Sequence, residues 1–234
     1  MLGVSGRDLG VAKSLILRRT KSDAGVILPP LREHVSTVRW CDTQEAKMAR
    51  RFHDGDEGLA EIVRLLRARQ TCVLPALVEP VLSKTSKLDR VVEQIQANAQ
   101  NGRAKLVFCH FRGEIDELKR RLGHELHVAS FDGRVKHVER KEILTYRHDV
   151  LLCQIQTGCE GLNLQQFEEV YFVSPHWNPA VEDQAVARCH RIGQQNSVDV
   201  YRFCMGIFDN ETASIEAYVC GVQTGKREIA KELL

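Results

Sequence analysis

From residue 86 onward, the sequence alternates short β-rich runs with amphipathic helical patterns. Five runs rich in β-branched and aromatic residues are strand candidates: 105–109, 126–130, 150–154, 170–173 and 198–203. Four segments with helical spacing alternate with them: 88–97, 115–122, 138–144 and 180–192. The central runs are almost continuously apolar, as expected when helices cover both faces of a parallel sheet. The alternation predicts an α/β, three-layer domain with a mainly parallel sheet over residues 86–210.

The residues on either side of this domain follow other patterns. Residues 1–35 are basic and then marked by prolines, which predicts a short helix followed by an extended connector. Residues 36–85 have mostly helical spacing, with Thr43 as a candidate N-cap, and are interpreted as a helical appendage. Residues 211–234 predict one amphipathic helix. We therefore expect a sheet-based domain with helical flanks and no second full domain.

Composition limits the class of protein only loosely. The net charge of +2 indicates no particular kind of partner. No stretch resembles a signal peptide or a membrane span, so we expect a soluble intracellular protein. The eight cysteines are scattered without a C-x-x-C pair, which is typical of reduced core cysteines. A metal enzyme using Cys109, His110 and Cys159 is disfavoured because their spacing matches no metal site, so we expect no metal ligands.

Three loops follow predicted strands and are therefore expected at the carboxyl edge of the sheet, where open α/β sheets bind ligands. They span residues 110–113, 156–164 and 174–179. The second contains Gly158 and Gly161, which allow a backbone to approach a ligand closely. An ordinary turn fits the same residues when this loop is considered alone.

Residues 181–194 combine a polar stripe and an apolar stripe. Gln184, Arg188 and Arg191 fall at i, i+4 and i+7 on one helical face, and Gly193 is the expected helix stop. The apolar stripe consists of Val181, Ala185, Cys189 and Ile192. Two guanidinium groups and an amide on one face suit a bound polyphosphate, whereas a solvated basic face is the alternative explanation.

In order and spacing, three motifs resemble the last motifs of the Swi/Snf family: Gly161–Leu164, Trp177–Pro179, and residues 184–194 with Gln184, Arg188 and Arg191. That family consists of superfamily-two DNA-dependent ATPases with two RecA-like lobes. The resemblance covers essentially the whole chain and implies a RecA-like second motor lobe over residues 86–210. Residues 65–72 resemble the repair-type branch that often carries an inserted RING finger. Residues 1–35 look like a remnant of lobe one with its connector, and residues 211–234 like a bracing helix.

For the nucleotide, the resemblance implies that Arg188 and Arg191 are arginine fingers that reach ATP held by lobe one. Gln184 and the backbone of Gly161 would line the nucleotide side of the cleft. ATP and Mg²⁺ would be bound mainly by lobe one. The fingers would stabilise charge on the transferred phosphoryl group.

For the nucleic acid, the resemblance implies sequence-independent contacts to the phosphates of double-stranded DNA. Thr157, Gly158, Arg112 and Lys87 would face the tracking strand. Trp177 would lie against the DNA, and the alternative for this residue is a core anchor of the preceding strand.

Some residues depart from the family pattern. Cys159 stands where many relatives have a glycine, and Ser174 where many have an aspartate. No Walker-type phosphate loop occurs in the 234 residues, and residues 221–227 imitate one only imperfectly, within the predicted C-terminal helix. We therefore expect half of an ATPase site, which requires a first lobe in cis or in trans and does not hydrolyse ATP alone.

Two functions remain open at this point. The favoured one is a motor lobe of a DNA translocase, and the alternative is a non-catalytic RecA-like module that binds DNA or a protein. A nuclear location is the family expectation. Repair, transcription termination and chromatin remodelling are all compatible with the sequence.

Overall fold

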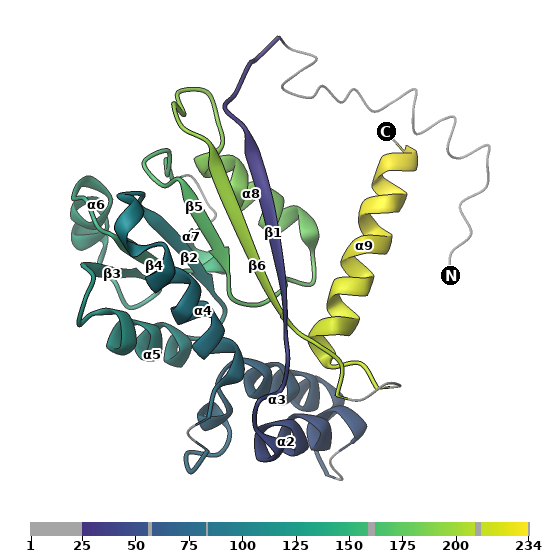
Figure 1. The fold of residues 1–234 in the computed structure, drawn as a ribbon. Coiled ribbons are helices and arrows are strands. Elements are labelled where there is room, and N and C mark those ends of the chain that lie inside the picture. The colour runs from purple at the N-terminus through teal and green to yellow at the C-terminus, as the bar shows by residue number, and fades with distance from the viewer. Residues whose placement is uncertain (1–24, 56–57, 83, 159–161, 209–211, 234) are drawn as a thin grey trace.

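A computed structural model describes residues 25–55, 58–82, 84–158, 162–208 and 212–233. Within these residues, six strands form one sheet in the order β1-β6-β5-β2-β4-β3, and all neighbouring strands are parallel. The strands are β1 (Leu31–Val38), β2 (Lys105–Cys109), β3 (Val128–Phe131), β4 (Val150–Gln154), β5 (Glu169–Phe172) and β6 (Val198–Met205). Helices pack on both faces of the sheet (Figure 1), which confirms the predicted α/β, three-layer architecture.

The centre of the sheet agrees closely with the sequence pattern. The strands predicted at 105–109 and 150–154 have the bounds of β2 and β4, and the other three predictions overlap β3, β5 and β6. Every residue of β2 and of β5 is buried. Continuous apolar runs identify such strands because both of their faces contact helices.

The edge strand β1 corrects the predicted connector. Residues 31–38 pair along their whole length with residues 198–205 of β6, so the expected boundary between residues 35 and 36 falls inside a strand. Most side chains of β1 are exposed, and only Val38 is buried. Backbone pairing with β6 holds this strand in place. Its sequence therefore has no apolar pattern that would predict a strand.

The helices also match their predicted positions, with differences at the ends. They are α2 (Thr43–Asp54), α3 (Glu61–Val73), α4 (Ser86–Ala97), α5 (Arg112–Leu122), α6 (His137–Thr145), α7 (Ile155–Gly158), α8 (Pro179–Cys189) and α9 (Ile215–Leu233), with short 3₁₀ turns η1 (Pro75–Leu77) and η2 (Ala99–Asn101). Asp42, and not Thr43, caps α2. Its carboxylate accepts the backbone N–H groups of Gln44 at 2.7 Å and Glu45 at 3.1 Å.

Two apolar clusters lie on opposite faces of the sheet. One contains Phe52 of α2 and Cys72 of α3 together with Val107 of β2, so these two helices share a core with the sheet. The other contains Phe108 of β2 and Ala185 of α8. Successive residues of β2 therefore point into different clusters, as the alternation of side chains along a strand requires.

The C-terminal helix α9 runs along the β1 side of the sheet (Figure 1). It includes residues 221–227, so the imperfect phosphate-loop sequence is helical, as predicted. None of the helices within the described residues is both long and apolar enough to cross a membrane.

Candidate nucleotide and nucleic-acid site

Three loops meet at the carboxyl edge of the sheet because β5, β2 and β4 are parallel neighbours. The Gln154 side chain, at the end of β4, donates from Nε2 to the carbonyl oxygen of His110 at 3.4 Å. The rings of His110 and His176 stack with their centroids 5.7 Å apart. The structure thus brings together the loops that the sequence placed at one edge.

The residues expected to face DNA phosphates lie in two of these loops. Thr157 is half-buried, and with Gly158 it forms the end of the short helix α7, directly after β4. Arg112 is exposed at the first position of α5, directly after β2. A Cβ atom at Gly133 would lie 3.2 Å from Nη2 of Arg112, so this side chain extends toward the loop after β3. An exposed guanidinium and a threonine hydroxyl at one edge suit a phosphate.

Trp177 is partly anchored in the core, which was the alternative to its predicted DNA contact. Its indole is half-buried and packs against the apolar cluster of α2 and α3. The indole and the Tyr218 ring of α9 meet edge to face, with their centroids 6.4 Å apart. The guanidinium carbon of Arg69 lies 5.9 Å from the indole, and Arg69 donates to the carbonyl oxygen of Pro175 at 2.9 Å. The loop is therefore anchored from α3, and part of the indole stays accessible.

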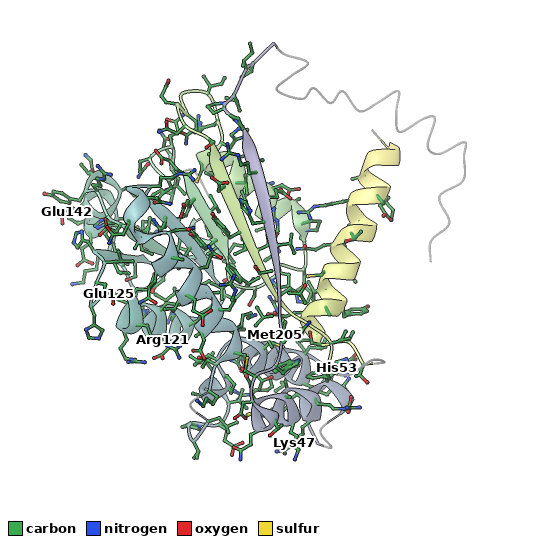
Figure 2. The ribbon with its side chains drawn as sticks, viewed as in Figure 1. Lys47, His53, Arg121, Glu125, Glu142 and Met205 are labelled. Atoms are coloured by element: carbon green, nitrogen blue, oxygen red, sulfur yellow. The ribbon has the colours of Figure 1, made fainter. Side chains whose placement is uncertain are left out.

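Lys87 corrects the prediction for DNA binding. Its side chain is fully buried, where Nζ forms an ion pair with Glu216 and donates to Ser174 Oγ at 2.7 Å. Glu216 also accepts the backbone N–H of Met205 at 2.9 Å. Met205, labelled in Figure 2, is the last residue of β6. A buried ammonium with these partners is not available to a phosphate backbone. Its role is to join α4, α9 and the loop after β5.

Burial also sets the charge of neighbouring groups. Desolvation raises the pKa of Glu114 to about 7, although its carboxylate accepts the backbone N–H groups of His110 and Phe111. Burial, followed by the nearby Arg69 charge, holds the pKa of His110 well below its ordinary value, so this imidazole is neutral at pH 7. Among the described residues, no group of His, Cys, Asp and Glu side chains could hold a metal ion.

Helix α8 carries the residues expected to face the nucleotide, but it ends earlier than predicted. Gln184 is exposed and Arg188 half-buried on the helix, which ends at Cys189. Arg191 is exposed in the turn that follows, so it does not continue the helical stripe. Gly193, with φ +100°, belongs to this turn and is not the helix stop.

A residue without a predicted role explains this end. The buried side chain of Gln194 folds back and donates from Nε2 to the carbonyl oxygens of Cys189 at 3.3 Å and Gln165 at 2.9 Å. Its Oε1 accepts the backbone N–H groups of Gln195 and Asn196. A side chain that satisfies the last helical carbonyl replaces the expected glycine cap. A buried glutamine of this kind leaves no signal in an apolar pattern.

The segment after Gly161 lies against this end of α8. The backbone N–H of Leu164 donates to the carbonyl oxygen of Arg188 at 3.3 Å, and the Gln165 side chain donates to the carbonyl oxygen of Ile192. Gly161 itself, like Cys159, lies outside the described residues. The structure therefore brings the continuation of the glycine loop to the arginines. Trp177 lies at the other end of α8, so the expected nucleotide and DNA residues form two separate groups.

Known proteins are similar to this chain in sequence, and others are similar in fold. The helicase conserved C-terminal domain family matches residues 84–193. An uncharacterised ATP-dependent helicase of Mycoplasma pneumoniae is 32% identical over 94% of the chain. The DNA repair proteins RAD5 of Saccharomyces cerevisiae and RAD5B of Arabidopsis thaliana are 33% and 37% identical over 64% and 52% of the chain.

Two solved structures share the fold. The C-terminal part of the Fun30 ATPase domain has a TM-score of 0.67 with 14% identity, covering 84% of this chain and 90% of that one. A Sulfolobus solfataricus SWI2/SNF2 ATPase core in complex with double-stranded DNA has a TM-score of 0.68 with 22% identity, covering 94% of this chain and 50% of that one. The chain carries the C-terminal RecA-like lobe of a Swi/Snf-type superfamily-two ATPase.

This Swi/Snf-type lobe is related to the repair-type RAD5 proteins, as its sequence motifs predicted. It spans only 22% of the length of the Mycoplasma helicase and 14% of yeast RAD5.

Proposed function

We propose that this lobe is the second motor lobe of an ATP-dependent translocase on double-stranded DNA, and that it works together with a first lobe that holds Mg²⁺ and ATP. One observation carries the proposal: in a lobe of Swi/Snf type, the segment after Gly161 lies beside Arg188. Two sequence motifs separated by a strand and a loop thus meet, which supports a nucleotide site beside them.

The residues at this end of α8 fit a polyphosphate. Gln184 and Arg191 are exposed and Arg188 is half-buried, so the group offers two permanent cations and an amide donor. Bound ATP supplies the phosphoryl group that is transferred to water. Arg188 and Arg191 act as arginine fingers that stabilise negative charge on that group, and Gln184 orients the nucleotide. The role of the Gly161 backbone stays a prediction.

The DNA contacts are proposed for the carboxyl edge. The Sulfolobus ATPase core, which has a similar fold, was solved in complex with double-stranded DNA. Arg112, Thr157 and the backbone of Gly158 would contact phosphates without reading bases, and the accessible part of Trp177 would lie against the backbone. Because Arg112 is the cation among these four residues, we expect it to contribute most to the salt dependence of binding.

The decisive experiment is reconstitution with a first lobe. The purified chain is mixed with the first lobe of a Swi/Snf relative, or fused to it, and ATP hydrolysis is measured with and without duplex DNA. We expect DNA-stimulated hydrolysis only when both lobes are present. Robust turnover by the chain alone would contradict the proposed division of labour. DNA binding without hydrolysis in any pairing would favour a non-catalytic RecA-like module.

We also propose a pathway and a cellular location for this lobe. The RAD5 relatives are named DNA repair proteins, so repair is the pathway that we propose first. A nuclear location is expected from the family, and microscopy of a fluorescent fusion in the source cells tests it. Exclusion of the fusion from the DNA compartment would contradict this expectation.

A further inference from the structure

Two thiols from different elements lie in contact at the base of α9. Cys204 is the last but one residue of β6, and Cys220 is on α9. Their Sγ atoms are 3.1 Å apart, although 16 residues separate them along the chain. No function proposed above uses either side chain.

The two thiols differ in access and in acidity. Cys204 is buried, whereas Cys220 is half-buried and can be reached from solvent. The hydrogen bond between them lowers the pKa of Cys220 and raises that of Cys204. Cys220 is therefore the thiol that ionises first. Since the thiolate is the nucleophile in thiol oxidation, the accessible member of the pair is also the reactive one.

We propose that Cys204 and Cys220 form an oxidation site, at which a peroxide converts the two thiols into a disulfide that joins α9 to β6. The Cys220 thiolate attacks the peroxide O–O bond, which yields a sulfenic acid and releases hydroxide, protonated to water. The Cys204 sulfur then attacks the Cys220 sulfur and loses its proton, and the second oxygen leaves as water. Two thiols and one hydrogen peroxide thus give one disulfide and two waters.

The surrounding contacts indicate what the crosslink does. Near Cys220, the Glu216 side chain attaches α9 to Lys87 of α4 and to the Met205 backbone of β6. Ser214, directly before α9, donates from Oγ to the Met205 carbonyl oxygen at 2.8 Å. A disulfide adds a covalent link beside these polar contacts. It therefore keeps α9 on β6 even when the buried ion pair is lost.

The test uses the whole chain with Cys41→Ser, which removes an exposed thiol that could form intermolecular disulfides. The protein is treated with hydrogen peroxide, remaining thiols are blocked with iodoacetamide, and peptides are mapped by mass spectrometry without reductant. We expect a linked Cys204–Cys220 peptide that a reductant removes. We also expect the oxidised protein to melt about 5–10 °C higher than the reduced protein, because the crosslink restricts the unfolded chain.

Matched variants separate a specific site from general oxidation. Cys220→Ser should abolish the linked peptide and the shift in melting temperature, and its half-buried position makes it the safer change for folding. Cys72→Ala, at a buried thiol of α3, should leave both unchanged. The proposal is overturned if folded protein yields only sulfinic acid at Cys220, links another pair of cysteines, or stays unoxidised while Cys72 reacts.

Discussion

The Lys87 ammonium and the Glu216 carboxylate form an ion pair that is fully buried beneath the carboxyl edge of the sheet. Lys87 belongs to α4 and Glu216 to α9, and the pair also contacts Ser174 and the backbone of Met205. A buried ion pair contributes little to stability compared with apolar residues in its place. Losing one partner, however, leaves the other charge buried and unpaired. The pair therefore ties the position of α9 to the loop that contains Trp177.

Breaking this pair should destabilise the lobe strongly. Lys87→Met leaves the Glu216 carboxylate buried without its cation, and we expect a loss of about 3–5 kcal/mol in the free energy of unfolding. Urea denaturation measures it. The double variant Lys87→Met, Glu216→Leu should lose less than Lys87→Met alone, because it leaves no charge unpaired. A loss below about 1 kcal/mol for the single variant would contradict the burial of the pair.

Removing an arginine finger should abolish turnover in the reconstituted two-lobe enzyme. We expect Arg188→Ala to lower DNA-stimulated kcat by about 10³- to 10⁵-fold, because a finger stabilises charge in the transition state. Arg188→Lys should restore little, since an ammonium cannot reproduce a planar fork of donors. Arg120→Ala, at an exposed residue of α5 that pairs with Glu117, is the matched control and should keep kcat within about twofold. Unchanged kcat in Arg188→Ala would exclude the finger role.

Arg112 should contact phosphate directly. Arg112→Ala is expected to weaken binding to duplex DNA equally for all sequences and to reduce the slope of log K against log salt by about 1. Fluorescence anisotropy at several salt concentrations gives this slope. If the slope stays unchanged while the affinity falls, Arg112 acts on the fold of the site and not on DNA.

Arg69 should act on DNA only through the Trp177 loop. Arg69→Gln removes the bond to the Pro175 carbonyl oxygen and the cation beside the indole. We expect about a tenfold loss in DNA affinity with an unchanged salt slope, because this guanidinium contacts no phosphate. In a Trp40→Phe background, the fluorescence of Trp177 should shift as the indole loosens. A smaller salt slope would instead place Arg69 on the DNA.

Glu114 should make the lobe less stable as the pH rises. Its pKa is raised from 4.5 in the unfolded chain to about 7 in the folded one, so the folded state binds the proton more tightly. This contribution is fully present below the unfolded value and is lost as the pH rises through 7. The loss is about 3 kcal/mol. Urea midpoints at acidic and alkaline pH should differ less in Glu114→Gln, and an equal difference in both proteins would contradict the shift.

The sequence predicted the parts of the fold that depend on apolar periodicity. Strands β2 and β4 have the predicted bounds because each is buried on both faces. Strand β1 escaped prediction because backbone pairing with β6 holds it while most of its side chains face solvent. The end of α8 was missed because the Gln194 side chain replaces the expected glycine cap, and the start of α2 was off by one residue because Asp42, and not Thr43, is the N-cap.

For the candidate site, the sequence identified the loops but not the surroundings of each side chain. The resemblance to the Swi/Snf family placed Lys87 on the DNA. The ion partner, Glu216, is 129 residues away, and only the folded chain shows the two together. Arg69 was missed for the same reason, since its contacts to Pro175 and Trp177 join segments far apart in the sequence.

The pairing of β1 with β6 has a practical consequence for how this lobe can be shortened. A chain that starts at Ser86 keeps almost the whole helicase C-terminal domain but loses the strand that covers the outer side of β6. Alternate residues along β6 would then present unpaired N–H and C=O groups, and such an open edge recruits strands from other molecules. Residues 31–38 thus protect the motor lobe from aggregation.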